Sequence, residues 1–360
     1  MNLNEGQPSL FRIYLQLMKL RVVILLQVTA ICAILAHDIM VRNGSLSGDR
    51  SWMDTLFACL ITLVGGTLAA GGSNSINMVY DRDIDPGMSR TRTRPIPNGW
   101  ISPKHAMVFG IIMAILGSGL FLIIHWKAAF WSLFSVLFYV FIYTIWLKRR
   151  TPQNIVIGGI AGATPPVIGW ICASSTNVPS NLNVFDLGSP VPWMLFMLIF
   201  FWTPPHFWAL ALYRSGEYAK VGVPMMPDVK GAKRTLLESK VYCFALFGLG
   251  LVPYFWPESG LSSNWSYIAT GLTFWYAISV WNIDPNEKLD ENGRMPKAFF
   301  SFMRSLGYLG WMFVAFVYVV AVPDDLFWLG LFFGLVIVVN RFVVKWMASV
   351  KEKRKILNAA

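Results

Sequence analysis

The sequence predicts an all-α fold, a polytopic bundle of transmembrane helices. Hydrophobic residues make up 55% of the 360 positions and charged residues only 14%, whereas about a quarter of an ordinary soluble domain is charged. Apolar segments long enough to cross a hydrocarbon core of about 30 Å recur along almost the whole chain. The basic residues gather in alternate connections between these segments, a pattern typical of membrane-threaded chains.

The apolar segments predict nine spans that form the main bundle and a tenth span that follows it. The bundle domain is expected at 22–322, after a short cytoplasmic lead at 1–21 and before an extra span with a basic tail at 323–360. No stretch remains for a sizeable soluble domain. The expected spans are roughly 22–41, 54–80, 105–125, 128–147, 154–173, 191–213, 241–256, 264–282, 305–322 and 326–344.

The net charge of +11 invites a nucleic-acid interpretation, but its distribution argues against one. Of the 30 Lys and Arg residues, 27 fall in the lead, the even-numbered connections and the tail. Because basic residues are retained on the cytoplasmic side, this pattern predicts cytoplasmic N- and C-termini, contacts with membrane lipids and no nucleic acid. We expect a multi-pass protein of a bacterial cytoplasmic (inner) membrane. The four cysteines lie singly in separate apolar segments, without disulfide or zinc spacing.

The second expected span ends in a polar stretch with the spacing of metal ligands. Asn77 and Asp81 are four residues apart and share one helix face. Asp85 precedes Pro86, which disfavours the α conformation. We therefore expect the helix to end near Ile84 and Asp85 to turn toward the same ion. These hard oxygen ligands predict Mg²⁺, which binds one or two carboxylates together with substrate phosphates.

Arginines follow the acidic motif closely. Arg90 and Arg94 can place their forked guanidinium groups on phosphate oxygens. Asp83 points away from the face of Asn77 and Asp81, and we interpret it as a solvated or structural carboxylate. The alternative is a charged loop that merely ends a membrane helix. Such a loop explains scattered charges, but not one Asn and two Asp in four-residue register.

The fourth span ends at a basic triplet, 148–150, and the fifth contains a proline pair. The triplet is typical of a topology anchor, and Lys148 is also a candidate to neutralise a carboxylate or a phosphate. Pro165 and Pro166 remove two backbone donors within the membrane. A helix broken there is tolerated where it is buried in protein or lines a cavity. Packing and cavity are both open, and we favour a cavity wall.

The sixth span carries a second proline pair directly before a histidine. Pro204 and Pro205 are expected to break the helix, and His206 is a functional candidate because ionisable residues are rare inside spans. The alternative is a histidine that only satisfies backbone groups within the bundle. Arg214 and Glu217 follow at the end of this span. Four crossings separate the ends of the second and sixth spans, so both polar clusters should lie at one membrane face.

These segments resemble a known family. The pattern NxxxDRDID followed by MxRTxxRPxP resembles the first motif of the UbiA-type intramembrane prenyltransferases. The segments GGxAGAxPPVIGW and TPPHFWALALYRSGEYAKVGVPMMPxVKG resemble a narrower group, the protoheme IX farnesyltransferases. The similarity covers about residues 15–322. Relatives that act on hydroxybenzoate usually show DxxYAxxD, where this chain keeps only Glu217 as the second acidic position. The family usually has nine helices, so the role of the tenth span stays open.

The resemblance implies farnesyl diphosphate and heme B as substrates, heme O and diphosphate as products, and Mg²⁺ as cofactor. It implies that Asn77, Asp81 and Asp85 bind the magnesium diphosphate. It further implies diphosphate contacts for Arg90, Arg94, Arg214 and Lys220, and a heme contact for His206. Our candidate catalytic residues are Asp81, Asp85, Arg214 and Glu217, and Lys148 and Tyr218 complete the candidate substrate-binding set.

Two other functions compete with this interpretation. One is a UbiA-type prenyltransferase that acts on an aromatic or quinone precursor. The other is a small-molecule transporter, because broken helices and a histidine at mid-membrane also suit alternating access. Against a transporter, the carboxylates gather at one membrane face beside arginines. The orientation of the heme, the oligomeric state and the docking of a heme A synthase stay open.

Overall fold

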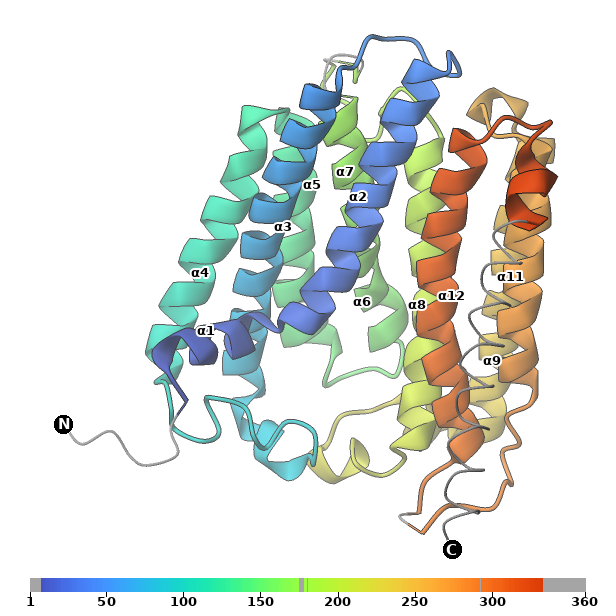
Figure 1. Cartoon of the computed structure of the whole chain (residues 1–360). Coiled ribbons are helices and arrows are strands. Elements are labelled where there is room, and N and C mark those ends of the chain that lie inside the picture. Colours follow the sequence, from blue (N-terminus) through green and yellow to red (C-terminus); the bar gives the residue numbers. More distant parts are fainter. Residues whose placement is uncertain (1–7, 175–177, 180, 292, 333–360) are drawn as a thin grey trace, which may run out of the picture.

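The computed structural model describes residues 8–174, 178–179, 181–291 and 293–332. These residues form helices and no strands (Figure 1), as predicted. The α-helices are α1 (Leu10–Met18), α2 (Leu20–Arg42), α3 (Trp52–Tyr80), α4 (Pro103–Leu120), α5 (Trp126–Leu137), α6 (Asn154–Ala163), α7 (Pro165–Ala173), α8 (Val191–Tyr213), α9 (Met226–Gly250), α10 (Val252–Phe255), α11 (Ser263–Trp281) and α12 (Pro296–Ala321). The short or wider turns are η1 (Asp81–Asp83), η2 (Asp85–Gly87), η3 (Phe121–Ile123), the π-helix η4 (Phe138–Leu147), η5 (Ala219–Val221) and η6 (Pro257–Ser259).

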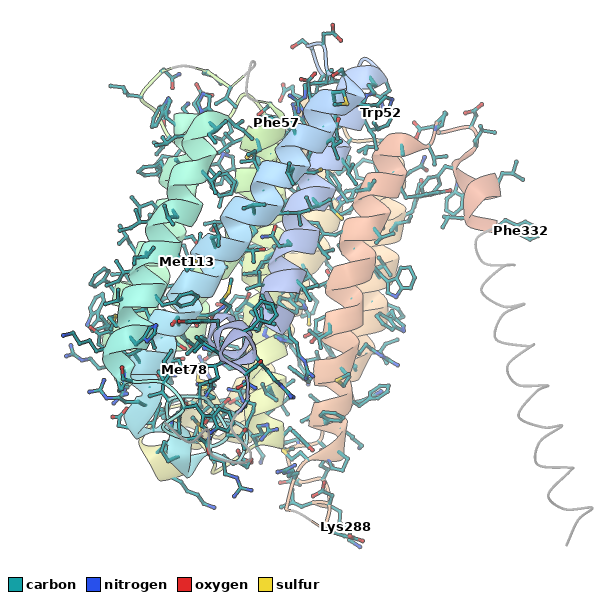
Figure 2. All side chains as sticks on the ribbon, turned by 60° about the vertical axis from the view of Figure 1, so that its left-hand side comes forward. Trp52, Phe57, Met78, Met113, Lys288 and Phe332 are labelled. Carbon is teal, nitrogen blue, oxygen red and sulfur yellow. The ribbon has the colours of Figure 1, made fainter. Side chains whose placement is uncertain are left out.

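The long helices stand side by side in a single bundle (Figure 1). One end of the bundle carries the connections 81–102 and 214–225. We call this the motif end and the other the opposite end. The short helix α1 lies across the motif end and packs against α3 near Met78 (Figure 2). The two polar clusters therefore share one end of the bundle, as the number of crossings predicted.

Glycines bring α3 and α4 into close contact. A Cβ atom added to Gly72 would lie 2.5 Å from the Gly110 carbonyl oxygen, and one added to Gly110 would lie 2.8 Å from the Gly72 carbonyl oxygen. A Cβ atom at Gly65 would lie 3.0 Å from the carbonyl oxygen of Gly117. Small residues are the usual means by which membrane helices pack closely. This packing fixes the position of α3, whose last turns carry the metal-ligand candidates.

The outer surface of the bundle is apolar. On α4, exposed side chains recur on one face, including Ile111 and Ile115, and Trp52 and Phe57 of α3 are also exposed (Figure 2). Within the described residues, seven helical segments are long and apolar enough to cross a membrane. An apolar surface of this extent has hydrocarbon as its natural surroundings. The chain is a multi-pass integral membrane protein.

Two helices begin earlier than predicted. α9 begins at Met226 rather than near 241, with a kink at Gly231, where φ is 79° and ψ is 162°. α12 begins at Pro296 rather than near 305. The connection between α11 and α12 is therefore shorter than the one expected between the spans 264–282 and 305–322. The first turns of α9 are polar and charged, and hydropathy does not detect helix that continues beyond the apolar core. The tenth expected span, 326–344, lies largely outside the described residues, and the proposed domain boundaries stay predictions.

The two proline pairs behave differently. α6 ends at Ala163 and α7 begins at Pro165, so the predicted break in the fifth span is confirmed. The predicted break in the sixth span is wrong, because α8 runs continuously through Pro204 and Pro205. Membrane helices tolerate internal proline where side chains and neighbouring helices satisfy the freed backbone groups. Beside the proline pair, the Trp202 indole donates to the Ser305 carbonyl of α12 over 2.8 Å, which ties this part of α8 to its neighbour.

Candidate functional site

The acidic motif is built on the end of α3. This helix ends at Tyr80, one turn before the predicted end at Ile84, and η1 and η2 continue the chain as tight turns. Aspartates compete with the backbone for hydrogen bonds and so favour such helix ends. The Asp81 N–H still donates to the Asn77 carbonyl. Asp81 and Asp85 are 2% and 0% exposed, so both carboxylates are turned into the protein.

Each of the three predicted ligands is held by a cation. Lys148 Nζ lies 2.6 Å from Asp81 Oδ2, and Lys19 Nζ donates to Asn77 Oδ1 over 2.6 Å. Arg94 Nη1 lies 2.8 Å from each carboxylate oxygen of Asp85. The contacts are Asn77 with Lys19, Asp81 with Lys148 and Asp85 with Arg94. We call these six residues the motif cluster.

Burial changes the ionisation of the motif cluster. It raises the pKa of the Asp85 carboxyl, while the charge of Arg94 acts in the opposite direction. Burial also lowers the pKa of the Lys148 ammonium, against the charge of Asp81, and lowers the pKa of Lys19 well below its usual value. Charges removed from water interact more strongly than charges in bulk solvent. The motif cluster therefore holds charged groups of both signs inside the protein, where their interactions are strong.

The residues present fit a magnesium ion. Asp81 Oδ1 is buried and has no hydrogen-bond partner among the described residues, so a hard oxygen is left without a partner. No group of three or more His, Cys, Asp or Glu gathers in the described part of the chain. That excludes a cage built wholly from such side chains there. It suits Mg²⁺, which takes one or two carboxylates and completes its shell with phosphate and water.

A π-helix aligns a second helix with the end of α3. η4 continues α5 toward the motif end, and its hydrogen bonds span five residues instead of four. Eight residues from Asn74 to Asp81, at the end of α3 and the start of η1, face ten residues from Tyr139 to Lys148. The wider turns of η4 absorb the difference. The contacts are Tyr139 Oη to Asn74 Oδ1 at 3.4 Å, Asn77 Nδ2 to Thr144 Oγ1 at 3.1 Å and Lys148 Nζ to Asp81 Oδ2 at 2.6 Å.

The second acidic position joins three connections of the motif end. Ser89 Oγ lies 3.1 Å from both Glu217 carboxylate oxygens. Arg214 Nη1 donates to the same carboxylate over 3.2 Å, and Arg294 Nη2 over 3.4 Å. The segments after α3, after α8 and before α12 thus meet at one carboxylate. This geometry makes Glu217 a holding point for Arg214 rather than a further ligand of the first motif.

The remaining predicted residues lie around this site at different depths. Arg90 and Lys220 are exposed at the motif end. Tyr218 is half-buried and packs on the apolar cluster that contains Ile84 and Met88 of the first motif. Asp83 is exposed and pairs with Arg149 over 2.6 Å, as expected of a structural carboxylate.

His206 lies apart from the motif cluster. Its ring stacks on Trp202 with centroids 4.2 Å apart and on Phe302 with centroids 4.8 Å apart. Its Nδ1 lies 2.6 Å from the Ser305 hydroxyl. The side chain is only 5% exposed. The structure thus places His206 between α8 and α12, and the predicted heme contact stays a prediction.

Sequence reasoning gave too little weight to two cations. Lys19 precedes the first expected span, where basic residues are expected to contact membrane lipids, yet its ammonium group donates to Asn77. Arg294 falls in the connection between α11 and α12, and no local motif distinguishes it. Only the number of membrane crossings indicates its place, because this connection returns to the motif end. Only the fold brings it to Glu217.

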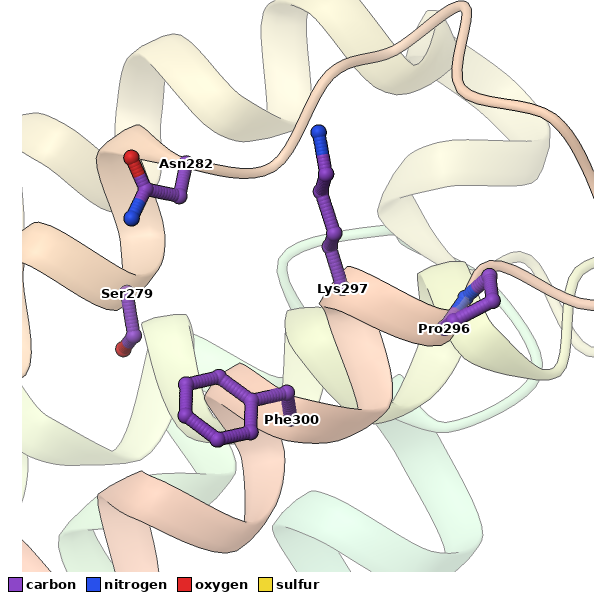
Figure 3. A pocket seen from close by; sticks show the side chains of 5 residues that line it. All are labelled: Ser279, Asn282, Pro296, Lys297 and Phe300. Atoms are coloured by element: carbon purple, nitrogen blue, oxygen red, sulfur yellow. The ribbon is translucent and has the colours of Figure 1, made fainter.

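The surface also contains hollows away from the motif cluster. One of about 410 Å³ lies where α11 ends and α12 begins, lined by Ser279, Asn282, Pro296, Lys297 and Phe300 (Figure 3). None of these five residues belongs to the motif cluster, and none is among the described hydrogen-bond partners of Glu217. This hollow is therefore not the site that the acidic motif builds.

Buried carboxylates, facing cations and an all-helical membrane bundle define a class of protein. The model of the UbiA prenyltransferase family matches residues 44–306, and the chain belongs to this family. A protoheme IX farnesyltransferase of Parvibaculum lavamentivorans is 40% identical over 289 residues, which cover 80% of this chain and 83% of the relative. A protoheme IX farnesyltransferase of Bartonella bacilliformis is 38% identical over 305 residues, which cover 83% and 88%.

Solved structures show the same fold. A structure of a digeranylgeranylglyceryl phosphate synthase matches with a TM-score of 0.64 at 18% identity, covering 86% of this chain and 98% of the other. A UbiA homologue from Archaeoglobus fulgidus bound to DMAPP and Mg²⁺ matches with a TM-score of 0.58 at 18% identity, with the same coverage of 86% and 98%. At this identity the likeness concerns the fold alone.

Proposed function

We propose that the chain transfers the farnesyl group of farnesyl diphosphate to a vinyl group of heme B and so forms heme O and diphosphate. The observation that carries the proposal is the motif cluster, in which buried ligand oxygens are paired with Lys and Arg side chains. The names of the curated relatives support the choice of substrates. The apolar surroundings suit both substrates, because a farnesyl chain and a porphyrin are lipophilic.

Binding exchanges the partners within the motif cluster. Asn77, Asp81 and Asp85 would hold the metal of a bound magnesium diphosphate. Lys19, Lys148 and Arg94 would then turn from Asn77, Asp81 and Asp85 to the phosphate oxygens. When bound, Mg²⁺ supplies charge neutralisation that helps diphosphate to leave. Arg214, Arg90 and Lys220 are the proposed outer contacts of the diphosphate, and Glu217 positions Arg214.

The chemistry begins with cleavage of the bond between farnesyl C1 and oxygen. The electron pair leaves with diphosphate, and the cations of the motif cluster stabilise the growing negative charge. The terminal vinyl carbon of heme bonds to C1, and positive charge moves to the carbon next to the porphyrin. Water adds there and loses a proton, which gives the hydroxyethylfarnesyl group. Burial of the reacting groups keeps water from the farnesyl cation before that step.

His206 is our proposed heme contact, through iron or the porphyrin edge. The Ser305 hydroxyl that faces Nδ1 supports a fixed ring orientation, which a ligand needs. Replacement of His206 by Ala should lower heme affinity and leave binding of an unreactive farnesyl thiolodiphosphate intact. An unchanged heme absorption spectrum in this variant would instead assign the histidine to packing alone.

We further propose that the motif end faces the cytoplasm of a bacterial inner membrane. This orientation places the site where soluble farnesyl diphosphate and Mg²⁺ are supplied. The exposed apolar faces of the helices contact lipids. A heme A synthase is a proposed partner, because heme O is lipophilic and is best passed on within the membrane. Co-purification of the two proteins from membranes tests this contact.

The deciding experiment uses the full chain in liposomes with farnesyl diphosphate, heme B and Mg²⁺. The expected product is a heme that is heavier by one farnesyl group and one hydroxyl group and elutes as a more hydrophobic species. Unchanged heme would contradict the proposal. Prenylation of an added aromatic acid would favour a quinone-precursor enzyme instead. Movement of the diphosphate across the membrane without conversion would favour a transporter.

A further inference from the structure

The hollow between the end of α11 and the start of α12 offers polar groups to a ligand. Its volume is about 410 Å³, and Lys297 and Asn282 form part of its wall (Figure 3). The Lys297 backbone N–H donates to the Glu287 carboxylate over 3.2 Å. The Lys297 ammonium group and the Asn282 side-chain amide have no hydrogen-bond partner among the described residues. Both groups are therefore available to a molecule that enters the hollow.

A second cation lies directly beside the hollow. Lys297, Phe300 and Arg304 are spaced by three and four residues, so they share one face of α12. The Arg304 guanidinium lies 4.5 Å from the centroid of the Phe300 ring and 5.0 Å from that of the Trp275 ring. It also donates to the Trp275 carbonyl over 3.4 Å. Arg304 thus joins α11 and α12 one turn further into the bundle than Phe300, which lines the hollow.

These cations lie at the level of lipid headgroups. The apolar span of α12 is expected to begin at 305, whereas the helix begins at Pro296, so nine residues precede the apolar span. They correspond to about 13.5 Å of helix, and Lys297 and Arg304 both belong to them. Lys240 of α9 also precedes its expected span and lies 5.4 Å from the centroid of the Trp281 ring. Basic and aromatic side chains are typical of the boundary between hydrocarbon and headgroups.

The surface that continues from the hollow into the membrane is apolar. Phe300 and Trp311 of α12 are exposed on the face that carries Lys297. Phe274 and Ile278 of α11 are exposed as well. Lipid chains are the natural neighbours of such a surface. A ligand with a polar head and apolar chains can therefore place its head beside Lys297 and its chains along these side chains.

We propose that this hollow binds the headgroup of an anionic phospholipid. The lipid phosphate accepts from Lys297 and Arg304, and the Asn282 amide donates to a further headgroup oxygen. Basic pockets between membrane helices bind anionic lipid headgroups in this way. The chain's own residues 333–360 carry six Lys or Arg and one Glu, and this positive charge disfavours them as the occupant. The inference does not depend on the proposed prenyl transfer.

The test measures the lipid selectivity of the full chain in detergent by native mass spectrometry. Phosphatidylglycerol should bind roughly tenfold more tightly than phosphatidylcholine with the same acyl chains, as expected of two basic contacts. The double variant Lys297→Gln, Arg304→Gln should bind both lipids equally. The control Arg234→Gln, Lys288→Gln removes the same charge from exposed positions and should keep the preference (Lys288 is labelled in Figure 2). Equal loss in both double variants, or no preference in the wild type, would overturn the proposal.

A second measurement needs no variant. Phosphatidylglycerol with a photoreactive diazirine beside its headgroup should crosslink the wild-type chain mainly within residues 275–282 and 296–304. Crosslinks spread evenly over the apolar surface would overturn the site even if the first double variant does not fold. Inorganic phosphate in excess should not displace the lipid, because it lacks the acyl chains. Displacement by phosphate would overturn the lipid assignment and make the hollow a site for soluble anions.

Discussion

The two oxygens of Asp81 have different surroundings, and the difference gives this residue its role. Oδ2 accepts from Lys148, while Oδ1 is buried without a partner in the described part of the chain. A buried acceptor without a partner costs about 1–3 kcal/mol. That cost is offset if a bound cation satisfies the oxygen during turnover. Asp81 is therefore the stronger candidate for a metal ligand. Both oxygens of Asp85 already accept from Arg94.

We expect Asp81→Asn to lower turnover by about 10²-fold or more, because the neutral amide neither attracts the metal nor balances Lys148. Turnover is measured at saturating Mg²⁺ and farnesyl diphosphate. Asp83→Asn is a matched control two residues away. It removes an exposed pair with Arg149, and such pairs contribute only about 0–1 kcal/mol. Wild-type turnover in Asp81→Asn would refute the metal-ligand assignment.

Lys19 occupies an unusual backbone conformation. Its φ of 52° is the only positive value at a non-glycine position in the described residues. The left-handed conformation ends α1 and turns the chain into α2. A bulky residue held there costs on the order of 1 kcal/mol. The same turn places the Lys19 ammonium group beside Asn77. The strained backbone conformation thus belongs to a residue whose side chain contacts the motif cluster.

For Lys19→Met we expect the KM for farnesyl diphosphate to rise about tenfold, the effect of one charge-assisted contact of about 1.4 kcal/mol. Steady-state kinetics at varied diphosphate concentration measures it. Lys19→Arg should retain part of the affinity. Arg21→Met is the control, since Arg21 is exposed two residues further on. If the two Met variants have the same KM, Lys19 serves only the membrane surface.

At the scale of elements, the close contact between α6 and η4 controls the site. Gly158 of α6 leaves room for the Tyr143 ring, because any other residue would place a Cβ atom against that ring. A larger residue must displace the ring or part the two helices, because cores resist added volume at a cost of about 1–3 kcal/mol.

Gly158→Ala should therefore lower the rate of prenyl transfer by roughly tenfold and destabilise the bundle by about 1–3 kcal/mol. Thermal unfolding and single-turnover kinetics on the same preparation separate the two effects. Gly162→Ala lies one turn further along α6, and nothing stands within 4 Å of its added Cβ atom. It should match the wild type in both measurements. Equal behaviour of the two alanine variants would show that the Tyr143 ring has free space.

The sequence predicted the bounds of helices that are set by the length of an apolar segment. It missed the bounds that depend on packing between helices. α2, α3 and α8 begin and end within two residues of the expected spans. The polar start of α9 lies beyond the apolar segment, so hydropathy did not detect it. α8 continues through Pro204 and Pro205, where Trp202 and His206 contact Ser305 of α12. The π-helix has no sequence signature, since its turns differ from α turns only in hydrogen bonding.

The candidate site was predictable where local spacing specifies it. Four-residue spacing brought Asn77, Asp81 and Asp85 into one cluster before any fold was known. Lys148 was recognised as a possible partner of a carboxylate, and it pairs with Asp81. Lys19 and Arg294 depend on contacts across more than 50 positions of sequence. Such contacts follow from helix packing and leave no local pattern.

For the whole molecule, the two ends of the bundle differ in the number and the surroundings of their Lys and Arg residues. The cations of the opposite end contact carboxylate, carbonyl or hydroxyl oxygens of the bundle. Arg50 pairs with the buried Asp38 over 3.2 Å, and Lys127, 0% exposed, donates to the Asp186 carbonyl over 2.8 Å. Arg42 donates to Thr55 over 2.7 Å. At the motif end, Arg90 and Lys220 are exposed instead. The motif end carries most of the Lys and Arg residues, and such an excess is retained on the cytoplasmic side.

This contrast predicts the orientation of the bundle. In intact spheroplasts, a membrane-impermeant maleimide should label Leu182→Cys, at a position 88% exposed on the opposite end, and should not label Asn98→Cys, exposed at the motif end. After lysis both should react. The native Cys172 and Cys243 are buried, and Cys32 and Cys59 are half-buried within the bundle, so the parent chain gives the background. Labelling of Asn98→Cys alone before lysis would reverse the orientation and place the diphosphate site outside the cytoplasm.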